Sequence, residues 1–230
     1  MTLLHLIIIF ILGIWLGSIT ARIGRKLAVS YTEVGNAERC KRWFPALLSR
    51  NGSRLQIGLE LAGGVLTTFS IWWFVGSLEW IVALCLITML LIIFVTDLLV
   101  MIIPNRVLLI FLPIFVVLRL FLELDPWWSP FAGALIGSGL LLVIMLVSRG
   151  GMGAGDMKLF GVLGIVLGWQ LVLLAFFLSC LLGAIIGIIL QILGKTARGQ
   201  AIPFGPYIVA ASLLTYFFGD TLLSWYLQFL

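Results

Sequence analysis

The stretch Leu84-Cys-Leu-Ile-Thr-Met-Leu-Leu-Ile-Ile-Phe-Val-Thr-Asp97-Leu-Leu-Val-Met-Ile-Ile103 is long and apolar enough to cross a membrane, yet it carries an aspartate. A membrane-spanning helix needs about 20 apolar residues. An ionisable side chain at that depth is costly unless it is paired or hydrated, so its presence indicates function. A second aspartate, Asp156, ends the glycine-rich stretch 150–156. The sequence therefore predicts a membrane protein with two acids that work together.

The composition of the whole chain agrees with a membrane protein. Hydrophobic residues make up 63% of the 230 residues, charged residues only 10%, and the mean hydropathy is +1.25. This is too little polar surface to cover a soluble globule of that size. We predict an all-α, polytopic bundle of about eight transmembrane helices, or seven if the short run 158–168 does not cross. The bundle is expected to form a single membrane domain over residues 1–230, with apolar runs at about 2–21, 56–76, 79–103, 107–122, 131–147, 158–168, 170–193 and 204–229.

The distribution of basic residues predicts the orientation. With eight spans and the N-terminus outside, every lysine and arginine except Arg119 falls on one side, which the positive-inside rule assigns to the cytoplasm. The largest cytoplasmic segment is then a basic loop at residues 22–55. Asp97 and Asp156 both lie near this face. Nucleic acid is not an expected partner, since the basic residues lack the interleaved aromatic residues of a binding platform.

Two carboxyl groups that meet in a poorly hydrated cleft can act as an acid and a base at once, because they cannot both ionise. This is the chemistry of aspartic proteolysis, in which one carboxylate activates water and the other carboxyl polarises the peptide carbonyl. Gly153 and Gly155 would let backbone and substrate approach Asp156 closely. Lys158 is interpreted first as a charge at the membrane surface, and second as a group that tunes the two acids.

Three motifs in this order resemble a known family. They are Thr96-Asp97 followed by Ile103-Pro104-Asn105, then Gly153-Ala-Gly155-Asp156-Met-Lys158, then Ile202-Pro203-Phe204-Gly205-Pro206. Over residues 57–215 the chain resembles the bacterial type IV prepilin peptidases, which are GxGD-type intramembrane aspartyl proteases.

The resemblance implies catalysis by Asp97 and Asp156. It also implies removal of short basic leaders from prepilins or pseudopilins of type IV pili, type II secretion or competence systems. Cleavage would occur at the cytoplasmic face of the bacterial inner membrane. The segment Pro203, Phe204, Gly205 and Pro206 is expected to line the cleft and present backbone groups to an extended substrate.

The basic loop departs from the family pattern. Many relatives carry two CxxC pairs there, a spacing that suits a tetrahedral zinc site, whereas residues 22–55 contain Cys40 alone. We therefore expect no metal and no cofactor for proteolysis, and interpret Cys85 and Cys180 as small apolar residues. Many relatives also N-methylate the new N-terminus with S-adenosylmethionine, and the sequence leaves this second activity open.

Two other functions use acids within a membrane. An ion- or proton-coupled transporter would place the aspartates along a path through the membrane, and would often show repeats relating the two halves. A general intramembrane protease of the presenilin kind shares the Gly-x-Gly-Asp motif alone. No convincing repeat is present in the sequence, and the Pro203–Pro206 segment argues against the presenilin kind.

Overall fold

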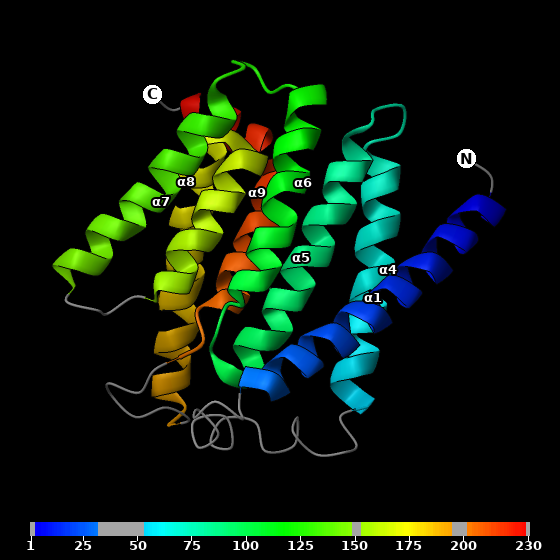
Figure 1. Cartoon of the computed structure of the whole chain (residues 1–230), viewed down its shortest axis with the longest axis horizontal. Coiled ribbons are helices and arrows are strands. Elements are labelled where there is room, and N and C mark those ends of the chain that lie inside the picture. Colours follow the sequence, from blue (N-terminus) through cyan, green and yellow to red (C-terminus); the bar gives the residue numbers. More distant parts are fainter. Residues whose placement is uncertain (1–2, 32–52, 149–152, 195–201, 229–230) are drawn as a thin grey trace. The chain divides into compact units, whose positions relative to one another are not determined.

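The computed structural model describes residues 3–31, 53–148, 153–194 and 202–228, and over these residues the chain is entirely helical, without strands (Figure 1). Five of the helices are long and apolar enough to cross a membrane. The prediction of an all-α, polytopic membrane protein is confirmed. The described helices are α1 (Leu3–Tyr31), α4 (Ser53–Trp73), α5 (Glu79–Val100), α6 (Asn105–Phe121), α7 (Ser129–Val147), α8 (Ala154–Ile192) and α9 (Gly205–Leu227).

Helix α8 contains a chain reversal. Gly168, in its middle, has φ +79° and ψ 176°, a conformation that is open essentially to glycine alone. The rings of Phe160 and Phe176 lie 5.8 Å apart between centroids, whereas in a straight helix these residues would be about 24 Å apart. The chain therefore turns back at Gly168, and residues 154–167 and 169–192 form two antiparallel arms. Figure 1 shows them side by side, the first yellow-green and the second gold.

The count of helices differs from the predicted eight because of this reversal. The structure has seven helices in its described part, and α8 covers both of the runs predicted at 158–168 and 170–193. The two arms of α8, on either side of the non-helical Gly168, correspond to these two runs.

Helix α1 corrects the start of the predicted basic loop. The apolar run was expected to end near residue 21, but the helix continues to Tyr31, so residues 22–31 are helical. Ala21, Gly24 and Ala28 are buried at helical spacing, so this stretch has a packed face of its own. The rest of the predicted loop that precedes α4, residues 32–52 with Cys40, lies outside the described residues.

The chain divides into two compact units, Met1–Leu118 and Arg119–Leu230. In the first unit, α1 packs against both α4 and α5. A Cβ on Gly17 of α1 would lie 2.5 Å from the carbonyl oxygen of Leu59 in α4, and one on Gly24 would lie 2.8 Å from Cβ of Val95 in α5. Small residues allow such close helix contacts within a membrane. The prediction of one membrane domain stays a prediction.

In the second unit, α8 packs against both α7 and α9. Gly133 and Gly164 meet where α7 crosses the first arm of α8, and a Cβ on either would overlap the backbone of the other helix. A Cβ on Gly137, one turn further along α7, would lie 2.7 Å from the carbonyl oxygen of Phe160 and 3.0 Å from Val172. These two residues belong to different arms, so α7 covers both arms of the hairpin.

Candidate active site

Asp97 lies in the last turn of α5, the most buried of the five candidate spans. Its side chain is only 5% exposed. The helix ends just beyond it, because Met101 adopts a left-handed conformation and its N–H donates to the carbonyl oxygen of Asp97 at 2.9 Å. A buried acid is thus held at the end of a buried helix.

The residues around Asp97 have structural roles. The Thr96 hydroxyl donates back to the carbonyl oxygens of Ile92 and Ile93, at 3.2 and 3.1 Å, which satisfies a polar group that is fully buried. Pro104 ends the connection, and its carbonyl oxygen accepts from the N–H of Val107 at 3.1 Å as α6 begins. The motif Ile103-Pro104-Asn105 is therefore the turn between α5 and α6.

Asp156 lies in the first turn of α8 and is half-buried. Gly153 precedes the helix in an extended conformation, with φ −74° and ψ 137°. A Cβ on Gly153 would lie 3.3 Å from Oδ2 of Asp156, so the carboxylate folds back over the helix start. The first-turn N–H groups have no partners within the helix, and they favour a negative charge beside them. Gly155, also predicted in the site, is half-buried in the same turn.

Lys158 is exposed, two residues beyond Asp156. Two residues correspond to about 200° around a helix, so the two side chains leave α8 on opposite faces. This geometry favours the interpretation of Lys158 as a charge at the membrane surface over its interpretation as a group that tunes the two acids.

The segment Pro203–Pro206 leads into α9 and packs on the second arm of α8. Phe204 directly precedes the helix, and its ring meets that of Tyr207 edge to face at 6.3 Å between centroids. A Cβ on Gly183 of α8 would lie 3.2 Å from the Phe204 ring and 3.4 Å from the Tyr207 ring. Pro203 and Gly205 are buried, and Phe204 and Pro206 are half-buried. Phe204 is therefore an anchor of this segment on α8.

The hairpin brings this segment and Asp156 to the same end of the second unit. Phe160 and Phe176 are equally far from Gly168 along the chain and lie in contact. Equal steps further from the turn place Gly153 level with Gly183, on which Phe204 packs. The starts of α8 and α9 lie at this end in Figure 1. Gly153, Gly155, Asp156 and Pro203–Pro206 thus lie toward the same end of the second unit. Asp97 belongs to the first unit. A shared site for these residues, including the pairing of Asp97 with Asp156, stays a prediction.

Two of the three cysteines, Cys85 and Cys180, lie among the described residues. Over the described ranges, no group of three or more histidine, cysteine, aspartate or glutamate residues could hold a metal ion. Cys85 is half-buried in α5, and Cys180 is exposed on the second arm of α8. Cys40 lies outside the described residues.

One residue was missed by the sequence reasoning. Arg119 appeared only as the exception to the charge distribution, but its side chain is 6% exposed and bonds to α8. The available signal was a single cation within the apolar run 107–122.

Comparison with known proteins bears on both aspartates. A profile of the type IV leader peptidase family matches residues 84–188, which contain Asp97 and Asp156. This segment of the chain is thus similar to the type IV leader peptidase family. No solved structure matches the chain.

Curated relatives carry the name prepilin leader peptidase/N-methyltransferase. The protein from Bacillus subtilis (strain 168) is 43% identical over 152 residues, which cover 66% of this chain and 61% of the relative. The Legionella pneumophila protein is 38% identical over 114 residues, covering 48% of this chain and 39% of the relative. The Pseudomonas aeruginosa protein is 42% identical over 85 residues, covering 37% of this chain and 29% of the relative. The chain therefore spans less than two thirds of the length of these type IV leader peptidase relatives.

Proposed function

We propose that the chain is an intramembrane aspartyl endopeptidase that removes the short basic leader of type IV prepilins or pseudopilins. The observation that carries this proposal is that one family match, residues 84–188, includes both acids found at helix ends. The transporter and the presenilin-like protease have no comparable support. The pilus, type II secretion or competence system that would supply the substrate is part of the same proposal.

The proposed reaction divides acid and base between the two carboxyls. Asp156 is the proposed base, because the first-turn N–H groups of α8 favour its negative charge. It takes a proton from water, whose oxygen attacks the carbonyl carbon of the scissile bond. Asp97, the proposed acid, sits at the opposite kind of helix end and donates its proton to the carbonyl oxygen. Collapse of the tetrahedral intermediate breaks the C–N bond, the leaving amine takes the proton that Asp156 removed from water, and one hydroxyl proton of the intermediate returns to Asp97 as the new carboxyl group forms.

The proposed location of this reaction is the cytoplasmic face of the bacterial inner membrane. The apolar helices support a multi-pass membrane protein, and the basic residues favour this orientation. Membrane lipids are then the surroundings of the chain, and the apolar part of a prepilin would lie among them.

N-methylation of the new N-terminus, with S-adenosylmethionine as methyl donor, is a second candidate activity. It is favoured by the names of the relatives. No described residue is assigned to it, since most of the basic loop at residues 22–55, which departs from the family pattern, lies outside the described residues. Transfer of labelled methyl from S-adenosylmethionine to a cleaved prepilin would establish this activity, and its absence while cleavage proceeds would remove it.

Cleavage is expected to survive strong chelators and replacement of Cys40, Cys85 and Cys180 by alanine. The carboxyls activate water unaided, and Cys40 has no CxxC partner for a thiolate zinc site. Leader cleavage by purified protein, with and without chelator, is the measurement. Loss of cleavage on chelation that zinc restores would contradict the metal-free mechanism.

A substrate with valine in place of the glycine before the scissile bond is expected to be cleaved more slowly. A helical peptide bond is shielded, so the segment must unwind, and glycine favours this through its backbone freedom. The family resemblance implies glycine at this position. Changing the leader lysines to glutamine should lower the cleavage rate in anionic bilayers and leave it unchanged in neutral detergent, because lipid charge orients the leader. Unimpaired cleavage of the valine substrate would contradict the unwinding argument.

A further inference from the structure

Arg119 is a buried cation that completes the turn of the α8 hairpin. Its Nε and Nη2 donate to the carbonyl oxygen of Val166, at 3.1 and 2.7 Å, and its Nη1 donates to that of Leu122 at 3.3 Å. In an uninterrupted helix the Val166 carbonyl would accept from residue 170. The reversal at Gly168 removes that partner, and the guanidinium replaces it with a charge-assisted bond.

The other side of the turn is completed by α7. The Ser129 hydroxyl accepts from the N–H of Trp169, the first residue of the second arm, at 3.3 Å. The rings of Trp128 and Trp169 stack 6.4 Å apart. One backbone group on each side of the reversal is therefore satisfied, the Val166 carbonyl by Arg119 and the Trp169 N–H by Ser129, which is 6% exposed. This is what a turn within a membrane requires.

The turn also sets the depth of Asp156. Residues 154–167 rise about 21 Å as a helix, whereas the hydrocarbon core is about 30 Å thick. Tryptophan is enriched at membrane interfaces, and Trp128 and Trp169 lie at the turn. The opposite end of the short first arm, which carries Asp156, then lies roughly 9 Å inside the other boundary.

We propose that Arg119 is a positioning residue that holds the two arms of α8 in register and thereby places Asp156 for catalysis. The catalytic half of this inference rests on the proposed peptidase function, and the register half does not. Arg119 acts through the Val166 carbonyl and touches no reacting atom. Its planar fork makes two bonds to one oxygen, which a lysine cannot reproduce.

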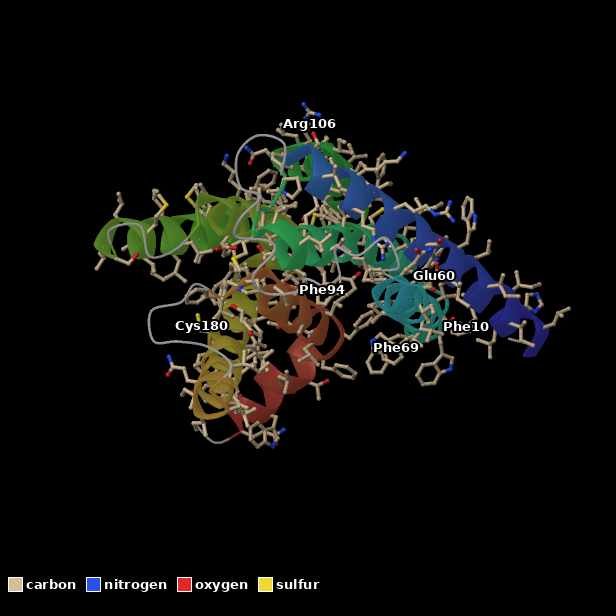
Figure 2. All side chains as sticks on the ribbon, turned by 90° about the horizontal axis from the view of Figure 1, so that it is seen from below. Phe10, Glu60, Phe69, Phe94, Arg106 and Cys180 are labelled. Carbon is tan, nitrogen blue, oxygen red and sulfur yellow. The ribbon has the colours of Figure 1, made fainter. Side chains whose placement is uncertain are left out.

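Cross-linking tests the register without any cleavage. In a protein whose native cysteines are changed to alanine, Phe160→Cys and Phe176→Cys place one thiol on each arm. Phe160 lies one helical turn after Asp156, and Phe176 lies opposite it on the second arm. We expect Arg119→Gln to slow oxidative cross-linking of this pair, Arg119→Lys to slow it less, and Ser129→Ala to act in the same direction. The matched control is Arg106→Gln, since Arg106 is an exposed arginine on the same helix and points away from it (Figure 2). This control should cross-link like the parent protein.

Kinetics with a prepilin test the catalytic half. Arg119→Gln is expected to lower kcat about 10²-fold with little change in KM, since a displacement of about 1 Å can have that effect. An unchanged cross-linking rate would overturn the proposal, and so would slower cross-linking with unchanged kcat. If the parent protein cleaves no prepilin, the proposed function fails, and cross-linking alone then decides whether Arg119 holds the register.

Discussion

Asp97→Asn and Asp156→Asn are each expected to lower leader cleavage by at least about 10²-fold, because acid–base groups typically contribute 10²–10⁴-fold. Each change removes ionisation with almost no change in volume. Asp97 is 5% exposed and Asp156 half-buried, so neither amide should prevent insertion of its helix. The measurement is the cleavage rate of a prepilin by purified protein, with expression and thermal unfolding followed in parallel.

The double variant should cleave the leader no more slowly than the less active of the two single variants. A pair of carboxyls that has lost one member cannot divide acid from base, so little remains for the second change to remove. The matched control is Asp220→Asn, an exposed aspartate near the C-terminal end of α9, which should cleave normally. Retention of more than about a hundredth of parental cleavage by either single variant would contradict the dyad.

Gly164→Ala is expected to destabilise the second unit by about 1–3 kcal/mol or more, because it adds a methyl group to a packed contact. That methyl group would overlap the backbone of Gly133, and backbone atoms cannot rotate away as a side chain can. Relief requires that α7 and α8 separate, which also disturbs the hairpin. The measurement is thermal unfolding in detergent.

The matched control for this change is Gly139→Ala, on α7. A Cβ there would meet nothing within 4 Å, so the change should be neutral or slightly stabilising through the higher helix propensity of alanine. Equal stability of Gly164→Ala and Gly139→Ala would show that the α7–α8 contact tolerates a wider separation.

The positions of the helices could be predicted because apolar runs in a chain this hydrophobic have few alternatives to a spanning helix. The run predicted at 79–103 is α5, Glu79–Val100. Its end could not be predicted in detail, since Met101 takes the left-handed conformation usual for glycine. The extension of α1 to Tyr31 was missed because hydropathy falls once Arg22, Arg25 and Lys26 enter the sequence, although helix geometry continues.

The candidate site could be predicted as a set of residue types, and less well as an arrangement. Asp97 and Asp156 stand out because ionisable groups are rare at membrane depth. The role of Gly153 in letting the Asp156 carboxylate fold back was not visible, since it depends on the start of α8. The packing of the Phe204 ring on α8 at Gly183 was not visible either, because the contact is distant in sequence. The expectation that Phe204 lines a cleft stays a prediction.

The sequence by itself determined that the chain is a helical membrane protein with two acids in recognisable motifs, because hydropathy and charge act locally along a chain. The sequence also predicted two runs that meet at residues 168–170. Only the tertiary structure decided that Gly168 makes the reversal and that Arg119 and Ser129 bond to its backbone. Both depend on hydrogen-bonding groups from segments separated by 47 and 40 residues. A buried polar backbone group must find a partner, but the sequence does not say which helix will supply it.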